Sequence, residues 1–121
     1  MGKTILIIDD ELMITDILSK IISKIEFDTH VCRDGKEAMQ YFKDNHHNIA
    51  LTVLDMIMPG MDGRETFNAI REIDPYAKIL IVSGYSSQED VSDLLEMGDA
   101  EFLEKPFRSK QLIDEIEKMI D

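Results

Sequence analysis

The sequence is poor in cysteine and in basic residues. Cys32 is its one cysteine, so no disulfide can form within the chain, and we expect an inert core residue in a reducing, cytoplasmic setting. Lys and Arg number 13 against 25 Asp and Glu, which gives a formal net charge of -12 at pH 7. Nucleic acids and anionic membranes bind proteins through Lys and Arg. We therefore expect no direct contact with nucleic acid and none with a membrane.

Long apolar runs are also missing. The first run, Thr4 to Ile8, ends at Asp9 and Asp10, so it is too short for a signal-peptide core, and no other stretch approaches the length that spans a bilayer. The chain shows no repeat, linker or low-complexity segment. A length of 121 residues with 44% hydrophobic content predicts one domain over residues 1–121, built around one core.

Short apolar runs alternate with stretches of helical spacing. The predicted strands are Thr4–Ile8, Thr29–Cys32, Ile49–Leu54, Ile79–Val82 and Ala100–Glu104. The predicted helices are Glu11–Ile25, a helix capped by Asp34 that runs to Asn45, Arg64–Ile73, Ser87–Met97, and a last helix from about Ser109. This alternation is typical of an α/β fold with a parallel sheet.

The polarity of the strands predicts their order. The first, third and fourth strands are nearly continuous apolar runs, as expected where helices cover both faces of a sheet. The second and fifth strands are more polar, with His30 and Glu101 among their residues, which favours the edges. The order 2-1-3-4-5 meets both requirements, so we predict a doubly wound, five-stranded parallel sheet.

Acidic residues follow the two strands at which this order reverses. Ligands of open α/β sheets bind at that point, beyond the carboxyl ends of the strands. Asp9 and Asp10 leave the first strand and Asp55 leaves the third. Carboxylates so close disfavour joint ionisation, and a divalent cation relieves this. Hard oxygen ligands suit Mg²⁺, and no His or Cys cluster points to zinc. Asp10 alone could merely cap the first helix; three acids at adjacent strand ends favour a metal site.

Ser83 and Lys105 follow the fourth and fifth strands. Taken singly, Ser83 would be a turn residue and Lys105 a solvated charge. Their places at successive strand ends put a hydroxyl and an ammonium beside the carboxylates. A carboxylate can accept a phosphoryl group, and transfer depends on neutralising the phosphoryl oxygens. The set predicts a site at which one of the carboxylates accepts a phosphoryl group.

Four motifs point to a known family. They are Ile8-Asp9-Asp10-Glu11, Leu54-Asp55-Met56-Ile57-Met58-Pro59-Gly60-Met61-Asp62-Gly63, Val82-Ser83-Gly84 and Phe102-Leu103-Glu104-Lys105-Pro106-Phe107. In this order and spacing, the chain resembles the receiver domain of two-component response regulators over essentially its whole length. The resemblance implies a CheY-like, flavodoxin-like sandwich of three layers.

The resemblance also implies a role for each metal-site residue. Asp55 is the expected phosphoacceptor. Asp10 and Asp55 are expected to bind Mg²⁺ through their carboxylates, Asp9 through water, and Ile57 through its backbone carbonyl. Departures from the common pattern are few, and one is Asp99, which follows Gly98 where a small residue is usual.

The same resemblance implies a switch. Ser83 is expected to move to the phosphoryl group and Phe102 to turn inward behind it. Lys105 is expected to contact a phosphoryl oxygen, with a cis bond to Pro106. Ile57 and Tyr85 flank the site without an acid or amide to orient water, so we expect slow loss of phosphate.

The implied function is signal transduction in a two-component phosphorelay. A histidine kinase or histidine phosphotransfer protein would donate the phosphoryl group, and an unidentified protein target would read an output surface formed by the fourth helix, fifth strand and fifth helix. The domain would not be an enzyme but a switch that assists its own phosphorylation and dephosphorylation. A free-standing regulator, a part of a longer protein, and a homodimer formed on phosphorylation all stay open.

Two other functions fit the fold less well. A hydrolase of the haloacid dehalogenase type needs a second Asp two residues after the nucleophile, where this chain has Ile57. A flavin-binding electron carrier needs a Ser/Thr/Gly-rich phosphate loop after the first strand. This chain has Asp9-Asp10-Glu11 there, which would repel a phosphate.

Overall fold

A computed structural model describes residues 2–56, 62–84 and 89–120 of the chain. Its five strands are β1 (Thr4–Ile8), β2 (Asp28–Cys32), β3 (Ile49–Asp55), β4 (Ile79–Ser83) and β5 (Ala100–Glu104). All neighbours pair in parallel, in the order β2-β1-β3-β4-β5. The predicted doubly wound sheet is confirmed.

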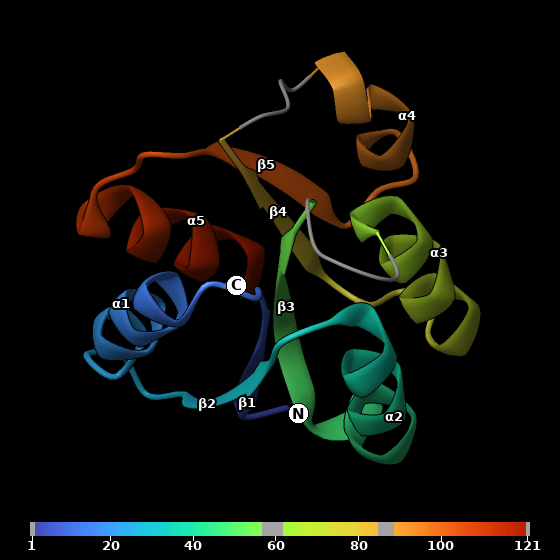
Figure 1. The fold of residues 1–121 in the computed structure, drawn as a ribbon, viewed down its shortest axis with the longest axis horizontal. Helices are drawn as coiled ribbons and strands as arrows, with labels where there is room; N and C mark the ends of the chain where they lie inside the picture. The colour runs from blue at the N-terminus through green and yellow to red at the C-terminus, as the bar shows by residue number, and fades with distance from the viewer. Residues whose placement is uncertain (1, 57–61, 85–88, 121) are drawn as a thin grey trace.

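Helices cover both faces of this sheet. They are α1 (Leu12–Ile22), α2 (Gly35–Asn45), α3 (Gly63–Ile73), α4 (Ser92–Leu95) and α5 (Ser109–Ile120), with short 3₁₀ turns η1 (His46–Asn48) and η2 (Glu89–Val91). In Figure 1, α1 and α5 lie on one side of the sheet and α2, α3 and α4 on the other, which confirms the three layers. None of the described helices is long and apolar enough to cross a membrane.

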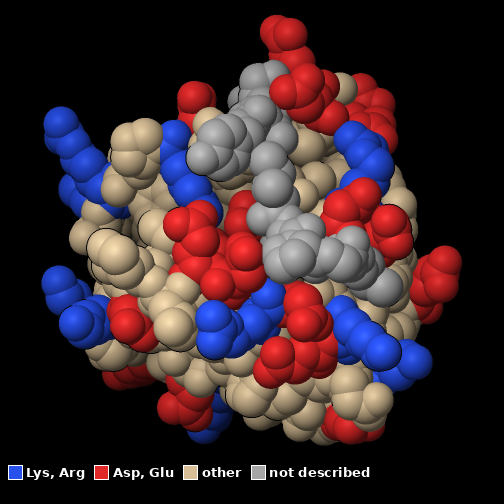
Figure 2. Space-filling model, viewed as in Figure 1, with Lys and Arg blue, Asp and Glu red and all other residues tan. Residues whose placement is uncertain are grey.

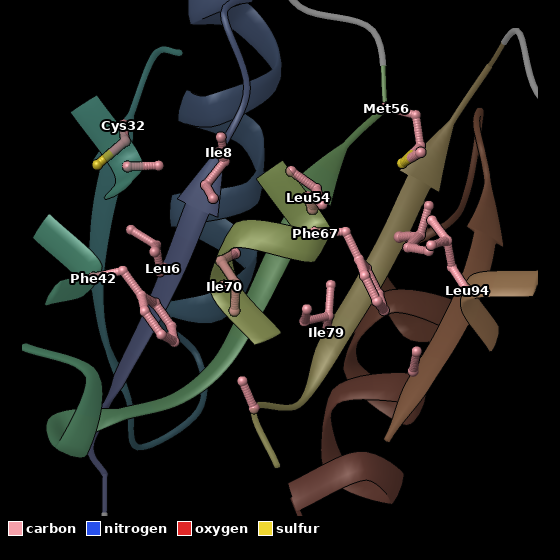
Figure 3. Packing of buried hydrophobic residues seen from close by; sticks show 14 of the residues in the cluster. Leu6, Ile8, Cys32, Phe42, Leu54, Met56, Phe67, Ile70, Ile79 and Leu94 are labelled. Atoms are coloured by element: carbon pink, nitrogen blue, oxygen red, sulfur yellow. The ribbon is translucent and has the colours of Figure 1, made fainter. Parts of the chain in front are cut away.

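The strands divide their side chains between two apolar layers. Ile5 and Ile7 of β1 pack with residues of α1 and α5, whereas Leu6 and Ile8 pack with residues of α2, α3 and α4. This alternation follows from the two-residue period of a strand. Figure 3 shows the second layer, with Phe42 and Phe67 reaching in from α2 and α3. Burial on both faces explains why the inner strands are apolar throughout.

Acidic caps fix two helix starts. Asp34 accepts a hydrogen bond from the backbone N–H of Glu37 at 2.8 Å at the start of α2, as the sequence predicts. Asp62 does the same for Glu65 at 2.8 Å at the start of α3. An Asp at the N-cap satisfies a backbone donor that the first helical turn leaves free.

Two helices are shorter than the periodicity predicts. The first was expected over Glu11–Ile25, but α1 ends at Ile22, because the backbone beyond it tightens into i→i−3 bonds such as Ile25 to Ile22 at 3.0 Å. The fourth was expected over Ser87–Met97, of which residues 87 and 88 lie outside the described part. There the chain forms η2 and then α4, which ends at Leu95.

A left-handed turn follows α4. Gly98 has φ 85° and Asp99 has φ 53°. Left-handed dihedrals cannot continue a right-handed helix, and a non-glycine residue such as Asp99 adopts them at an energetic cost. Arg71 of α3 donates to the carbonyl oxygens of both residues, at 2.6 Å for Gly98 and 3.0 Å for Asp99. Its guanidinium also lies 4.9 Å from the ring centroid of Phe67. Burial lowers the pKa of Arg71, against the opposing effect of the Asp99 carboxylate. The unusual Asp99 is thus held by a buried cation.

Candidate functional site

The sheet register brings the predicted site residues to one edge. Ile8 pairs with Leu54, so Asp9 and Asp55 leave neighbouring strands side by side. Asp55 pairs with Val82 on the other side, which places Ser83 one step beyond it. The carboxyl ends of β1, β3 and β4 therefore meet where the strand order reverses, as expected for a ligand site.

Three carboxylates converge at this edge. Asp9, Glu11 and Asp55 each offer an oxygen, and these oxygens all lie within 4.8 Å of one another. Asp9 and Asp55 are buried, with 1% and 5% exposure. The backbone N–H of Glu11 donates to Asp9 Oδ1 at 3.0 Å, which fixes the turn from β1 into α1. The predicted meeting of Asp9 with Asp55 is confirmed.

Asp10 was expected to converge with Asp9 and Asp55, but its carboxylate is not in the group of converging oxygens that the described residues form. It lines the cavity beside Asp55, but the group of converging oxygens among the described residues contains Glu11 instead. The alternative that Asp10 caps the first helix is wrong, since Glu11 is the N-cap of α1 and no side-chain cap bond forms there. A metal-binding role of Asp10 stays a prediction.

Lys105 supplies the cation of the site. Its Nζ lies 3.1 Å from Asp9 Oδ2 and 3.9 Å from Asp55 Oδ1, and its side chain is only 16% exposed. The backbone N–H of Lys105 donates to the carbonyl of Ser83 at 2.9 Å, which ties the end of β5 to the end of β4. The bond to Pro106 is cis, as predicted. Among the described residues whose charged groups converge here, one ammonium lies beside three carboxylates, and this excess of carboxylates favours binding of a further cation.

The two switch residues lie on adjacent strands. Ser83 is fully buried at the end of β4. Phe102 pairs with Ile81 across β4 and β5 and is partly buried against the apolar layer under α2, α3 and α4. Their roles in switching stay predictions. Ile57 and Tyr85 lie outside the described residues.

An open cavity of ≈ 610 Å³ lies over these groups. Its lining residues are Asp10, Glu11, Ile14, Asp55, Gly84, Lys105 and Pro106. On the face shown in Figure 2, Asp and Glu side chains gather near the middle. The cavity gives a small anionic group and a metal ion access to the Asp55 carboxylate.

Glu11 is the residue that the sequence reasoning missed as a member of the carboxylate group. It follows Asp9 and Asp10 directly, so the run of three acids after the first strand already contained it. Which two of these three consecutive acids bring an oxygen close to Asp55 depends on the turn into α1, where the Asp9 carboxylate accepts the N–H of Glu11. Composition and periodicity do not encode that turn.

Comparison with known proteins agrees with this geometry. The family model described as response regulator receiver domain matches residues 5–117. The chain belongs to the response regulator receiver domain family. A chemotaxis protein CheY from Thermotoga maritima is 31% identical over 120 residues, covering 98% of both chains. Sporulation initiation phosphotransferase F from Bacillus subtilis is 28% identical over 120 residues, covering 99% of this chain and 95% of the relative.

The fold comparison gives the same result. A solved response regulator receiver domain protein (CheY-like) from Methanospirillum hungatei superimposes with a TM-score of 0.90 at 25% identity, covering 100% of this chain and 95% of the other. Receiver domains serve two-component systems as phosphoacceptor switches rather than turnover enzymes, and phosphorylation on an aspartate is the general function of the family. The sequence-based assignment to this family is confirmed.

Proposed function

We propose that Asp55 is the aspartate that accepts the phosphoryl group, and that residues 1–121 act as one receiver domain in a phosphorelay. The observation that carries the proposal is the Lys105 ammonium, which lies 3.1 Å from Asp9 and 3.9 Å from Asp55 at the carboxyl edge of the sheet. Asp55 combines three properties: it is buried, lines the open cavity and lies beside a cation. Among the other described acids of this edge, Glu11 is exposed, Asp10 is only partly buried, and Asp9 is not among the residues that line the cavity.

The donor set of the site fits Mg²⁺. Carboxylate oxygens are hard ligands of the kind that Mg²⁺ takes while keeping several waters. Asp9, Asp10 and Asp55 would hold the ion, with the Ile57 carbonyl as the ligand implied by the family resemblance, and Glu11 is near enough to contribute. When bound, Mg²⁺ neutralises charge on the oxygens of the transferring phosphoryl group.

The proposed transfer needs one nucleophile and two stabilising groups from the chain. An Asp55 carboxylate oxygen attacks the phosphorus, and a new P–O bond forms as the bond from phosphorus to the donor imidazole nitrogen breaks and its electron pair leaves with the imidazole. Lys105 stabilises a phosphoryl oxygen, and the Ser83 hydroxyl donates to another. Phe102 then turns inward as the switch aromatic. In dephosphorylation, water takes the phosphoryl group and Asp55 is restored.

The proposed partners follow from the same chemistry. A histidine kinase or histidine phosphotransfer protein is the phosphoryl donor, and a protein target reads the surface formed by α4, β5 and α5. The cytoplasmic setting expected from the single cysteine stays a prediction, as do a homodimer on phosphorylation and the assisted loss of phosphate.

Acetyl phosphate with Mg²⁺, followed by intact mass measurement, tests the proposal. The wild-type chain should gain one phosphoryl group, and a chelator should prevent the gain. Asp55→Asn keeps the shape of the side chain and should gain none. Asp16→Asn, which changes an exposed acid on α1, is the matched control and should behave as wild type. A phosphoryl group on Asp55→Asn, or none on wild type, contradicts the proposal.

A further inference from the structure

The chain leaving Asp55 is pressed against the start of α3. The backbone N–H of Gly63 donates to the carbonyl of Met56 at 3.2 Å. A Cβ at position 63 would lie 2.4 Å from Met56 Cα and 2.8 Å from its carbonyl oxygen, which is closer than atoms approach without displacement. Met56 directly follows Asp55, so a shift of the backbone at Asp55 is passed by contact to the first residue of α3.

The next residue of α3 holds the η2–α4 segment. Arg64 donates to the backbone carbonyl of Asp90 at 2.8 Å and forms an ion pair with the Asp93 carboxylate. The hydrogen bond from Arg64 lowers the pKa of Asp93. The two side chains are 43% and 65% exposed, and water and salt weaken such pairs. The interactions of Arg64 with Asp90 and Asp93 are therefore weak enough to break and re-form.

Arg71 holds the other end of the same segment. It lies two turns along α3 from Arg64, and it is buried, with donation to the carbonyls that follow α4. Val91 and Leu94 of the η2–α4 segment are buried in the apolar layer that also contains residues of α2 and α3. The segment thus has a fixed anchor near residues 98 and 99 and a solvent-exposed one near residues 90 and 93.

We propose that the first two residues of α3, Gly63 and Arg64, connect the phosphoacceptor to η2–α4: Gly63 contacts Met56, and Arg64 binds the η2–α4 segment. Arg64 is a positioning residue that keeps the segment against α3, and phosphorylation of Asp55 loosens this hold by moving Met56 against Gly63. The second half of this inference rests on the proposed function; the first half does not. This connection does not involve Ser83 or Phe102, so it is a separate route from Asp55 to the η2–α4 segment.

Amide hydrogen exchange of the full chain, followed by mass spectrometry of peptides within residues 89–97, tests both halves. In the unphosphorylated protein, Arg64→Gln should raise exchange in these peptides roughly two- to five-fold, the range expected for an exposed ion pair. Arg64→Lys keeps the charge and should restore part of the protection. Lys110→Gln removes another exposed base, which pairs with Asp114 at 3.3 Å on α5, and should leave residues 89–97 unchanged.

Salt separates an electrostatic hold from a packing defect. Raising the salt to about 1 M, where the Debye length is about 3 Å, should raise exchange of residues 89–97 in wild type and have no effect in Arg64→Gln. Equal exchange in wild type and Arg64→Gln, or equal salt responses, overturns the positioning role.

Phosphorylation tests the connection to Asp55. Acetyl phosphate with Mg²⁺ should bring wild-type exchange in residues 89–97 close to that of Arg64→Gln and change the variant little. Wild type that gains the phosphoryl mass without a change in these peptides overturns the connection. If the proposed function is wrong, the wild-type protein gains no phosphoryl mass at all, which is a different result from a gain of mass without a change in exchange. The comparison of exchange in unphosphorylated wild type and Arg64→Gln still tests the positioning role of Arg64 in that case.

Discussion

Replacing Thr52 with valine should stabilise the protein. Thr52 is fully buried in β3, and its hydroxyl oxygen has no hydrogen-bond partner among the described residues. A buried hydroxyl without a partner costs roughly 1–3 kcal/mol, and valine has nearly the same shape. We expect a gain of about 1–2 kcal/mol in the free energy of unfolding, or roughly 3–8 °C in the midpoint at this chain length.

Urea unfolding followed by circular dichroism measures the change, with an unchanged slope showing that the unfolded state is unaffected. Thr66→Val is the matched control. Thr66 is also fully buried, but its hydroxyl donates to the carbonyl of Asp62 at 2.8 Å, so the same replacement should cost about 1 kcal/mol. If Thr52→Val is no more stable than wild type, or if both variants shift in the same direction, the reasoning about hydroxyl satisfaction is refuted.

Three further predictions concern the site and the core. Gly63→Ala should displace Met56 and slow phosphorylation by acetyl phosphate at least several-fold, as measured by intact mass against time; a wild-type rate would show that the 2.4 Å approach is relieved elsewhere. Burial raises the pKa of the Cys32 thiol from its usual 9.0 to about 12, with Glu37 and Asp34 adding to the rise. The folded state then keeps a proton on Cys32 that the unfolded state loses, so the contribution of Cys32 to stability should be constant below pH 9 and fall between pH 9 and 12. In urea unfolding at a series of pH values, Cys32→Ala should therefore lose less stability over this range than wild type. Ile57→Asn should speed loss of phosphate by providing an amide to orient water, and unchanged or slower decay of the phosphorylated mass would count against that.

The sheet and the site could be predicted for physical reasons. Strands covered on both faces must be apolar throughout, so the polarity of Thr29–Cys32 and Ala100–Glu104 was enough to place β2 and β5 at the edges. Once the order is known, parallel strands bring Asp9, Asp55 and Lys105 to one edge, because each follows the carboxyl end of a strand.

The rest depends on tertiary contacts that periodicity does not contain. The α4 region has helical spacing up to Met97, but its last turns tighten and a left-handed turn at Asp99 is held by Arg71 from another helix. The approach of Gly63 to Met56 likewise joins the residue after β3 to the first residue of α3. Neither contact has a signature in the local sequence, since each partner lies outside the element that it shapes.

The most direct test of the central claim is the location of the phosphoryl group. After treatment with acetyl phosphate and Mg²⁺, borohydride reduces an acyl phosphate of aspartate to homoserine, which peptide mass mapping identifies. We predict homoserine at position 55 and unmodified aspartate at positions 9 and 10. Homoserine at another position, or a phosphoryl group that resists reduction and maps to a hydroxyl side chain, would contradict the assignment of Asp55.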